Sequence, residues 1–208
     1  MATGDYCTLD ELKRDLWPDD VVPDDVNDAK LASVITGISR EIDAFCGTVF
    51  YDPGSDDTRY YTSPDGHSVR IDPATTITSV ATDDNLDRTY GTTWTASTHF
   101  ETWPYNANAF GGLPVTRLDR APLSAYSFPV TPRSVKVVGR FCYNASASAS
   151  ATLSDIKQAA LLKCVRMFKR KDAPFGVLGP TEAGQISVIP GFDPAELRIL
   201  NNYRINYT

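Results

Sequence analysis

Residues 30–51 read KLASVITGISREIDAFCGTVFY and contain the change of pattern that decides the fold. The first part of this stretch has apolar residues at alternating spacings of four and three, which places them on one stripe of a helix. These residues are Leu31, Ile35, Ile38, Ile42 and Phe45. Gly47 follows the last of them and is the residue type that most often ends a helix. We therefore expect a helix from about Val26 to Cys46, packed in its own core or against a neighbouring copy of the chain.

After Gly47 the helical spacing gives way to short segments rich in β-branched and aromatic residues, separated by turn signals such as Ser63-Pro64-Asp65-Gly66. About seven such segments at this spacing predict a small antiparallel sandwich or barrel. The expected strands are Thr48–Tyr51, Thr58–Thr62, Ser68–Ile71, Ile77–Thr82, His99–Trp103, Val115–Asp119 and Val135–Tyr143.

Helices are also predicted at both ends of the chain. Thr8-Leu9-Asp10-Glu11 has the pattern of a capping box and predicts a short helix that ends at Trp17-Pro18. Another helix is expected from Ser154, as its N-cap, to about Lys171, and one strand over Gln185–Ile189. Asp193-Pro194 opens a last short helix, in which Leu197, Leu200 and Tyr203 form a narrow apolar stripe.

These elements predict an α+β fold with two domains. A small helical bundle, with about three main helices and a short C-terminal helix, is expected from residues 1–47 and 152–208 together. An antiparallel β domain is expected as an insertion at residues 48–143. Residues 144–151, NASASASA, are expected to be a linker.

The composition is that of an ordinary globular protein: 208 residues, 42% apolar and 22% charged, with a net charge of −6. No apolar run is long enough to cross a membrane. The N-terminal residues do not resemble a secretory signal, so we expect a protein made and kept in a cytoplasm. Charge is unevenly distributed. Residues 5–28 contain nine acidic and two basic residues (−7), and residues 155–208 contain eight basic and five acidic residues (+3).

Few residues suggest catalysis or metal binding. The chain has no phosphate-binding loop, no G-x-S-x-G and no H-E-x-x-H, and its only histidines are His67 and His99. The four cysteines are far apart and never form C-x-x-C, so reduced, partly buried thiols are expected rather than a metal site. They are Cys7, Cys46, Cys142 and Cys164. We therefore expect no enzyme activity, no metal and no cofactor.

Two features allow a binding function. Aromatic residues of the β region, including Trp94 and Trp103, are typical of a small sheet's core and rim but also of a platform that binds carbohydrate, nucleic acid or peptide. The basic residues near Lys169 suit phosphate contact by charge. They also suit the last turn of a helix, and positions 163, 166 and 170 make one solvated face. Sequence-specific DNA binding is not favoured.

The order of motifs resembles head–tail connector (adaptor) proteins of long-tailed bacteriophages. YCTLDELKRDL and KLASVITGISREIDAFCGTVFY resemble the family's opening, in which a helix of the form I…AS..ID.YCGR.F follows a short acidic helix. IKQAALLKCVRMFKRKDAPFGVLG and FDPAELRILNNYR resemble its distal patterns, I..A.L..A..L..RRD.P.GV.G and LDP.V..LL..YR. The resemblance covers about residues 6–51 and 155–204, and larger members carry an insertion at the position of the β region.

This resemblance implies a structural virion protein of the neck, at the capsid–tail junction. Such proteins form a ring, usually of twelve subunits, under the portal. The ring extends the channel through which double-stranded DNA passes without sequence-specific binding, and stopper or tail-completion proteins attach to it. We further expect portal contacts from a C-terminal arm beyond the helical body: Phe192, Leu197, Leu200, Tyr203 and Arg204.

Contacts between subunits are expected from charge complementarity between the acidic N-terminal segment and the basic third helix. The residues are Asp19, Asp20, Asp24, Asp25, Arg166, Lys169 and Arg170. The alternative function is a soluble β-rich module that binds carbohydrate or peptide and has helical flanks.

Overall fold

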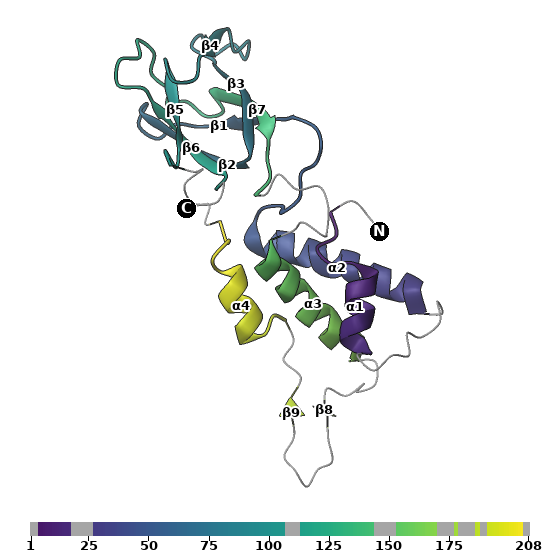
Figure 1. The fold of residues 1–208 in the computed structure, drawn as a ribbon. Coiled ribbons are helices and arrows are strands. Elements are labelled where there is room, and N and C mark those ends of the chain that lie inside the picture. Colours follow the sequence, from purple (N-terminus) through teal and green to yellow (C-terminus); the bar gives the residue numbers. More distant parts are fainter. Residues whose placement is uncertain are drawn as a thin grey trace. The chain divides into compact units, whose positions relative to one another are not determined.

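The computed structural model describes residues 4–17, 27–106, 113–143, 153–169 and 191–205, and the backbone of residues 177–178 and 186–187. The chain divides into two compact units (Figure 1). We call Met1–Gly47 with Ser146–Thr208 the helical unit, and Thr48–Ala145 the β unit. The predicted linker at 144–151 lies outside the described residues. None of the described helices is both long and apolar enough to cross a membrane.

The helical unit contains α1 (Leu9–Leu16), α2 (Asp28–Cys46), α3 (Ser154–Lys169) and α4 (Pro194–Leu200). Within this unit α3 contacts each of the other three helices. The chain between α3 and α4 includes a two-stranded antiparallel pair, β8 (Val177–Leu178) and β9 (Ile186–Ser187). Segments from both ends of the sequence therefore form one helical core.

Helix α2 confirms the apolar stripe predicted from the sequence. Leu31, Ile35, Ile38 and Ile42 are buried, and Phe45 is half-buried at the end of the stripe. Gly47 ends the helix in the left-handed region with φ of 71°, and its N–H donates to the Asp43 carbonyl over 2.8 Å. A side chain with a Cβ is disfavoured in this conformation, which explains why glycine stands there.

Both short helices begin with a capping box, as the sequence predicts. In α1 the Thr8 hydroxyl accepts from the Glu11 N–H over 3.1 Å, and the Thr8 N–H donates to the Glu11 carboxylate over 2.8 Å. In α4 the Asp193 N–H donates to the Glu196 carboxylate over 2.9 Å, and the Asp193 side chain accepts from the start of the helix. Each box satisfies N–H groups that a helix start otherwise leaves without partners.

The β unit consists of two antiparallel sheets. The first has the order β1 (Asp57–Tyr61), β7 (Val135–Arg140), β3 (Thr76–Thr82) and β4 (Thr92–Trp94). The second has the order β2 (Ser68–Ala74), β6 (Val115–Arg120) and β5 (Phe100–Trp103). The fold class is α+β, as predicted. Two local predictions were wrong: Thr48–Tyr51 is not a strand, and the short strand β4 was missed.

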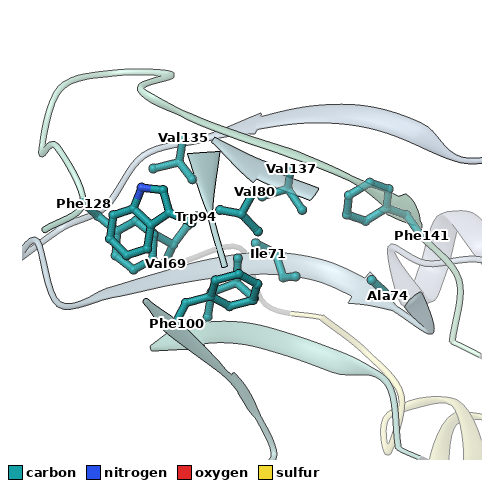
Figure 2. Close-up of a cluster of buried hydrophobic side chains, with 11 residues drawn as sticks. Val69, Ile71, Ala74, Val80, Trp94, Phe100, Phe128, Val135, Val137 and Phe141 are labelled. Carbon is teal, nitrogen blue, oxygen red and sulfur yellow. The ribbon is translucent and has the colours of Figure 1, made fainter. Parts of the chain in front are cut away.

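Apolar side chains from both sheets form the core of the β unit (Figure 2). Val135 and Val137 from β7 lie in this cluster with Val69 and Ile71 from β2. Trp94 stacks on Phe128 with ring centroids 4.1 Å apart and an interplanar angle of 6°. Its indole N–H donates to the Thr82 hydroxyl over 3.0 Å, so the polar group of this buried ring has a partner.

Candidate functional site

Several of the residues predicted to contact other proteins lie close together where α4 packs against α3. The Arg166 guanidinium, from α3, donates to Asp193 over 2.9 Å and to Glu196 over 2.9 Å. The Glu196 side chain is fully buried, and Arg166 is only partly exposed. Arg166 was expected to pair with a neighbouring subunit. In the structure its charge is instead neutralised by Asp193 and Glu196 of its own chain.

Lys163 lies in the same region and is also held internally. Its ammonium donates to the Gly191 carbonyl over 2.5 Å and lies 3.3 Å from the Glu41 carboxylate. The Phe192 ring centroid is 4.3 Å from the ammonium, within cation–π distance. The prediction of a solvated face through positions 163, 166 and 170 was wrong for Lys163, which is 4% exposed. Residues 191–192, distant in sequence, contact it.

The C-terminal segment itself packs onto the helical unit. Leu200 is fully buried, and Phe192 makes an edge contact with Phe45 of α2 at 5.2 Å between ring centroids. The Tyr203 hydroxyl donates to Asp155 of α3, and the Ile205 N–H donates to the Cys46 carbonyl over 2.9 Å. The structure therefore corrects the expectation of an arm beyond the helical body, because the apolar side of this segment finds its partners on α2 and α3.

The exposed side of the segment is distinct from this packed side. Arg198, Asn201, Asn202 and Arg204 are exposed, and Leu197 is half-buried. The Arg204 guanidinium lies 5.3 Å from the Phe45 ring centroid while the residue as a whole stays exposed. Among the residues predicted to contact the portal, Arg204 is thus accessible, Leu197 and Tyr203 are partly so, and Leu200 is not.

Several predicted contact residues lie outside the described part of the chain. These are Asp19, Asp20, Asp24, Asp25 and Arg170. Lys169 is described, and it is exposed in the last turn of α3, where the helix dipole favours a cation.

The N-terminal residues form a polar contact with α2 that the sequence did not predict. The Tyr6 hydroxyl donates to Asp43, and the Tyr6 N–H donates to the Ser39 hydroxyl over 3.1 Å. Arg40 donates to the Gly4 carbonyl over 2.6 Å and lies 3.2 Å from Asp43. Burial raises the pKa of Asp43 to about 6, although the hydrogen bond from Tyr6 and the charge of Arg40 both act to lower it.

The four thiols are free and buried, as predicted. Burial and the nearby Asp43 carboxylate raise the pKa of Cys46 to about 12. The thiol of Cys7 and burial together raise the pKa of Cys164. A thiol with a raised pKa stays protonated at neutral pH and is a poor nucleophile and metal ligand. In the described ranges no group of His, Cys, Asp and Glu side chains is arranged to hold a metal ion.

Of the two tryptophans considered for a ligand platform, Trp94 is 3% exposed and belongs to the core. Trp103, at the edge strand β5, is 39% exposed. The Arg117 guanidinium lies 4.6 Å from its ring centroid, and the Tyr105 ring contacts it edge-on at 4.9 Å. Asp119 fixes Arg117 through two contacts of 2.8 Å. The binding-module alternative therefore depends on Trp103 and cannot use Trp94.

No protein-family model matches the chain, and no curated protein matches it. Solved structures do resemble it. A chain from the neck of an empty gene transfer agent (GTA) particle, computed with C6 symmetry, has a TM-score of 0.57 at 17% identity. A chain from the virion of the native GTA particle has a TM-score of 0.61 at 15% identity. A chain from the neck of the native particle, computed with C12 symmetry, has a TM-score of 0.55 at 15% identity.

Each of these three comparisons covers 100% of this chain and 94% of the other chain. The likeness therefore includes both the helical unit and the β unit, and at these identities it shows the fold.

Proposed function

We propose that this chain is a structural protein of the neck of a phage-like particle. The observation that carries the proposal is the match of the whole chain, helical unit and β unit together, to chains from GTA particles, two of them from the neck. The match covers 94% of the other chain and therefore includes the helical unit together with the β unit that interrupts it. A shared fold does not by itself imply a shared function, so the role has to be tested directly.

In its finer form the proposal is a connector, or adaptor, that forms a ring under the portal and prolongs the DNA channel. Two observations support it. The motifs at residues 6–51 and 155–204 resemble that family, and the neck structures with similar chains were computed with C6 and C12 symmetry. A cyclic ring needs two different complementary faces on each subunit, since each copy contacts two neighbours through unlike surfaces.

The proposed role is structural rather than catalytic. Two side chains of types that often perform chemistry have structural partners here. The His99 ring accepts from the Thr95 N–H over 2.9 Å, and the Cys142 thiol contacts the Thr75 hydroxyl at 3.3 Å. The proposed partners are further copies of the chain, a portal protein, and a stopper or tail-completion protein.

The experiment is to mix the purified chain with the portal protein of the same particle and to examine the product by mass photometry and electron microscopy. We expect a ring of this chain on the portal, with a subunit number that matches the portal's symmetry or half of it. Particles assembled without the chain should contain heads that lack tails. A chain that stays monomeric with the portal, together with normal tailed particles in its absence, would refute the proposal.

A further inference from the structure

Residues 19–25 of the acidic N-terminal segment contain no cation that could neutralise them locally. Within residues 19–25, DDVVPDD, four of seven residues are aspartates and none is basic. Lys163 and Arg166 of α3 are already paired with carboxylates of their own chain. Lys169 of α3 is exposed, and three further cationic side chains of the described ranges gather on the β unit.

These three cations, Arg88, Arg133 and Lys136, surround two tyrosines, and we call the five residues the cation–tyrosine surface. Tyr60 of β1 is the cross-strand partner of Lys136 of β7, so both side chains leave the same face of the sheet. The Tyr60 and Tyr90 ring centroids are 5.2 Å apart. The Arg133 guanidinium lies 5.0 Å from the Tyr60 centroid, and the Lys136 ammonium lies 6.0 Å from that of Tyr90.

Hydrogen bonds hold this surface in one arrangement. Arg88 donates to the carbonyls of Pro132 and Arg133, each over 3.0 Å, and the Tyr90 hydroxyl donates to the Arg133 carbonyl over 2.8 Å. The backbone of three members is left-handed: φ is 65° at Arg88, 49° at Tyr90 and 58° at Arg133. Side chains other than glycine enter this region at an energetic cost, and such residues concentrate at binding and catalytic sites.

The nearby carboxylates do not neutralise these cations. Asp83 is buried and accepts from the N–H groups of Asp87 and Arg88 over 3.0 Å each. Asp84 accepts from the Thr92 hydroxyl, and Asp87 accepts from the Thr89 N–H and hydroxyl. Within the described ranges, the ion pairs of the β unit involve Arg59, Arg117 and Arg140, not Arg88, Arg133 or Lys136. Arg88 and Arg133 are exposed, and Lys136 is half-buried.

We propose that the cation–tyrosine surface binds the acidic segment Asp19–Asp25 of a second copy of the chain. The inference rests on the proposed ring, in which unlike surfaces of neighbouring copies meet. Carboxylates accept charge-assisted hydrogen bonds from Arg and Lys, and opposite charges accelerate correct encounter of two copies. Nucleic acid is the less favoured ligand. Arg133, Lys136 and the tyrosines themselves cover ring faces on which bases would stack, and the chain carries a net charge of −6.

The test measures binding of a fluorescent peptide of residues 18–26 to a full-length variant, which we call the receiver. In the receiver, Asp19, Asp20, Asp24 and Asp25 are replaced by Asn, so that its own acidic segment does not compete with the peptide. We expect saturable binding that weakens with added salt. Arg133→Ala/Lys136→Ala in the receiver should weaken it about tenfold or more, as the loss of two charge pairs predicts. The matched control is Arg70→Ala/Arg120→Ala, which removes the same charge from the other sheet and should leave binding unchanged. Unchanged tryptophan emission and circular dichroism verify that each variant is folded.

A mixing experiment distinguishes contact between copies from contact within one. Full chains that lack only the four aspartates, mixed with chains that lack only Arg133 and Lys136, should form one-to-one pairs that grow no further. Neither variant alone should pair.

Absence of peptide binding, equal binding by the Arg133→Ala/Lys136→Ala receiver, or absence of pairs would overturn the inference. So would stronger binding of a DNA duplex than of the peptide. If one of these negative results is found but rings still form on the portal, this inference is wrong and the proposed function stands. If the peptide binds but no ring forms on the portal, the proposed function is wrong and the contact between copies stands.

Discussion

The guanidinium of Arg166 lies 2.9 Å from the carboxylate of Glu196, and the Glu196 side chain has no exposure to solvent. These residues are 30 positions apart, on α3 and α4. Glu196 also accepts from the Asp193 N–H, so one carboxylate both caps α4 and attaches it to α3. A buried carboxylate without its cation is strongly unfavourable, and this contact therefore determines where the C-terminal segment lies.

Replacing Arg166 by Met should destabilise the helical unit by about 3–5 kcal/mol, because Glu196 would then be buried without a cation. The loss should be visible in urea unfolding followed by circular dichroism at 222 nm. Arg198→Met provides the control, since Arg198 is exposed on α4, the helix of Glu196, and should change stability by less than about 0.5 kcal/mol. Equal stabilities for the two variants would show that the buried ion pair does not attach α4.

Asp43 should make the helical unit less stable as pH rises. Its pKa in the folded chain is about 6, above the ordinary value of 3.8, so folding favours the protonated acid. The contribution to stability is complete below pH 3.8 and is lost as pH rises through 6, by on the order of 3 kcal/mol for a shift of this size. Urea unfolding at intervals from pH 4 to pH 7, compared between the natural chain and Asp43→Asn, isolates this contribution from those of other carboxylates. Parallel pH profiles would contradict it.

Two glycines should respond in opposite ways to substitution by alanine. A Cβ at Gly139, in β7, would lie 2.2 Å from the Thr76 carbonyl oxygen of the neighbouring strand, a distance that forces the strands apart. Gly139→Ala should therefore destabilise the β unit by about 2 kcal/mol or more, as overpacking does. It should be measured through tryptophan emission in urea in a chain with Trp17→Phe and Trp103→Phe, so that the signal comes from Trp94 in the core of this unit.

Gly37 lies within α2, and apart from its sequence neighbours and the backbone of its own helix no described atom lies within 4 Å of the position of an added Cβ. Gly37→Ala should stabilise the helical unit by about 0.5–1 kcal/mol, because alanine loses less backbone entropy in a helix. The measurement is urea unfolding followed at 222 nm. A destabilised Gly37→Ala would show that this part of α2 has a neighbour, such as another copy of the chain, under the conditions of the measurement.

The elements that the sequence predicted well are those with local causes. The capping boxes at Thr8 and Asp193 and the stripe of α2 depend on residues three or four positions apart, so their patterns are visible in the sequence. The pairing of β1 with β7 joins residues about 75 positions apart, such as Tyr60 with Lys136, and no local pattern contains it. Strand β4 was missed because three residues are too few to show alternation.

The sequence pointed to residues of the candidate site but did not predict which residues they contact. Arg166 was predicted to contact a neighbouring subunit, and Phe192 and Leu200 were predicted to contact the portal; in the structure all three contact their own chain. Charge and apolar spacing indicate that a residue needs a partner and do not indicate which one. For Lys163, the partner carbonyl at Gly191 is 28 residues away in the sequence, so a solvated face was the simpler interpretation.

Portal contact by the C-terminal segment should depend on its exposed side. Deleting residues from Gly191 onward would uncover α2 and α3 and remove Leu200 from the core, so loss of portal association in such a truncation would report misfolding as well as a lost contact. Arg198→Glu/Asn202→Glu changes only exposed positions of the segment. We expect this variant to keep its helical circular dichroism and to lose portal association at least tenfold, as like charges placed in an interface predict. Lys30→Glu, exposed on α2, is the control for added negative charge. If Arg198→Glu/Asn202→Glu and Lys30→Glu bind the portal equally well, another surface of the chain makes the contact. The predicted portal role of Leu197, Tyr203 and Arg204 would then be wrong.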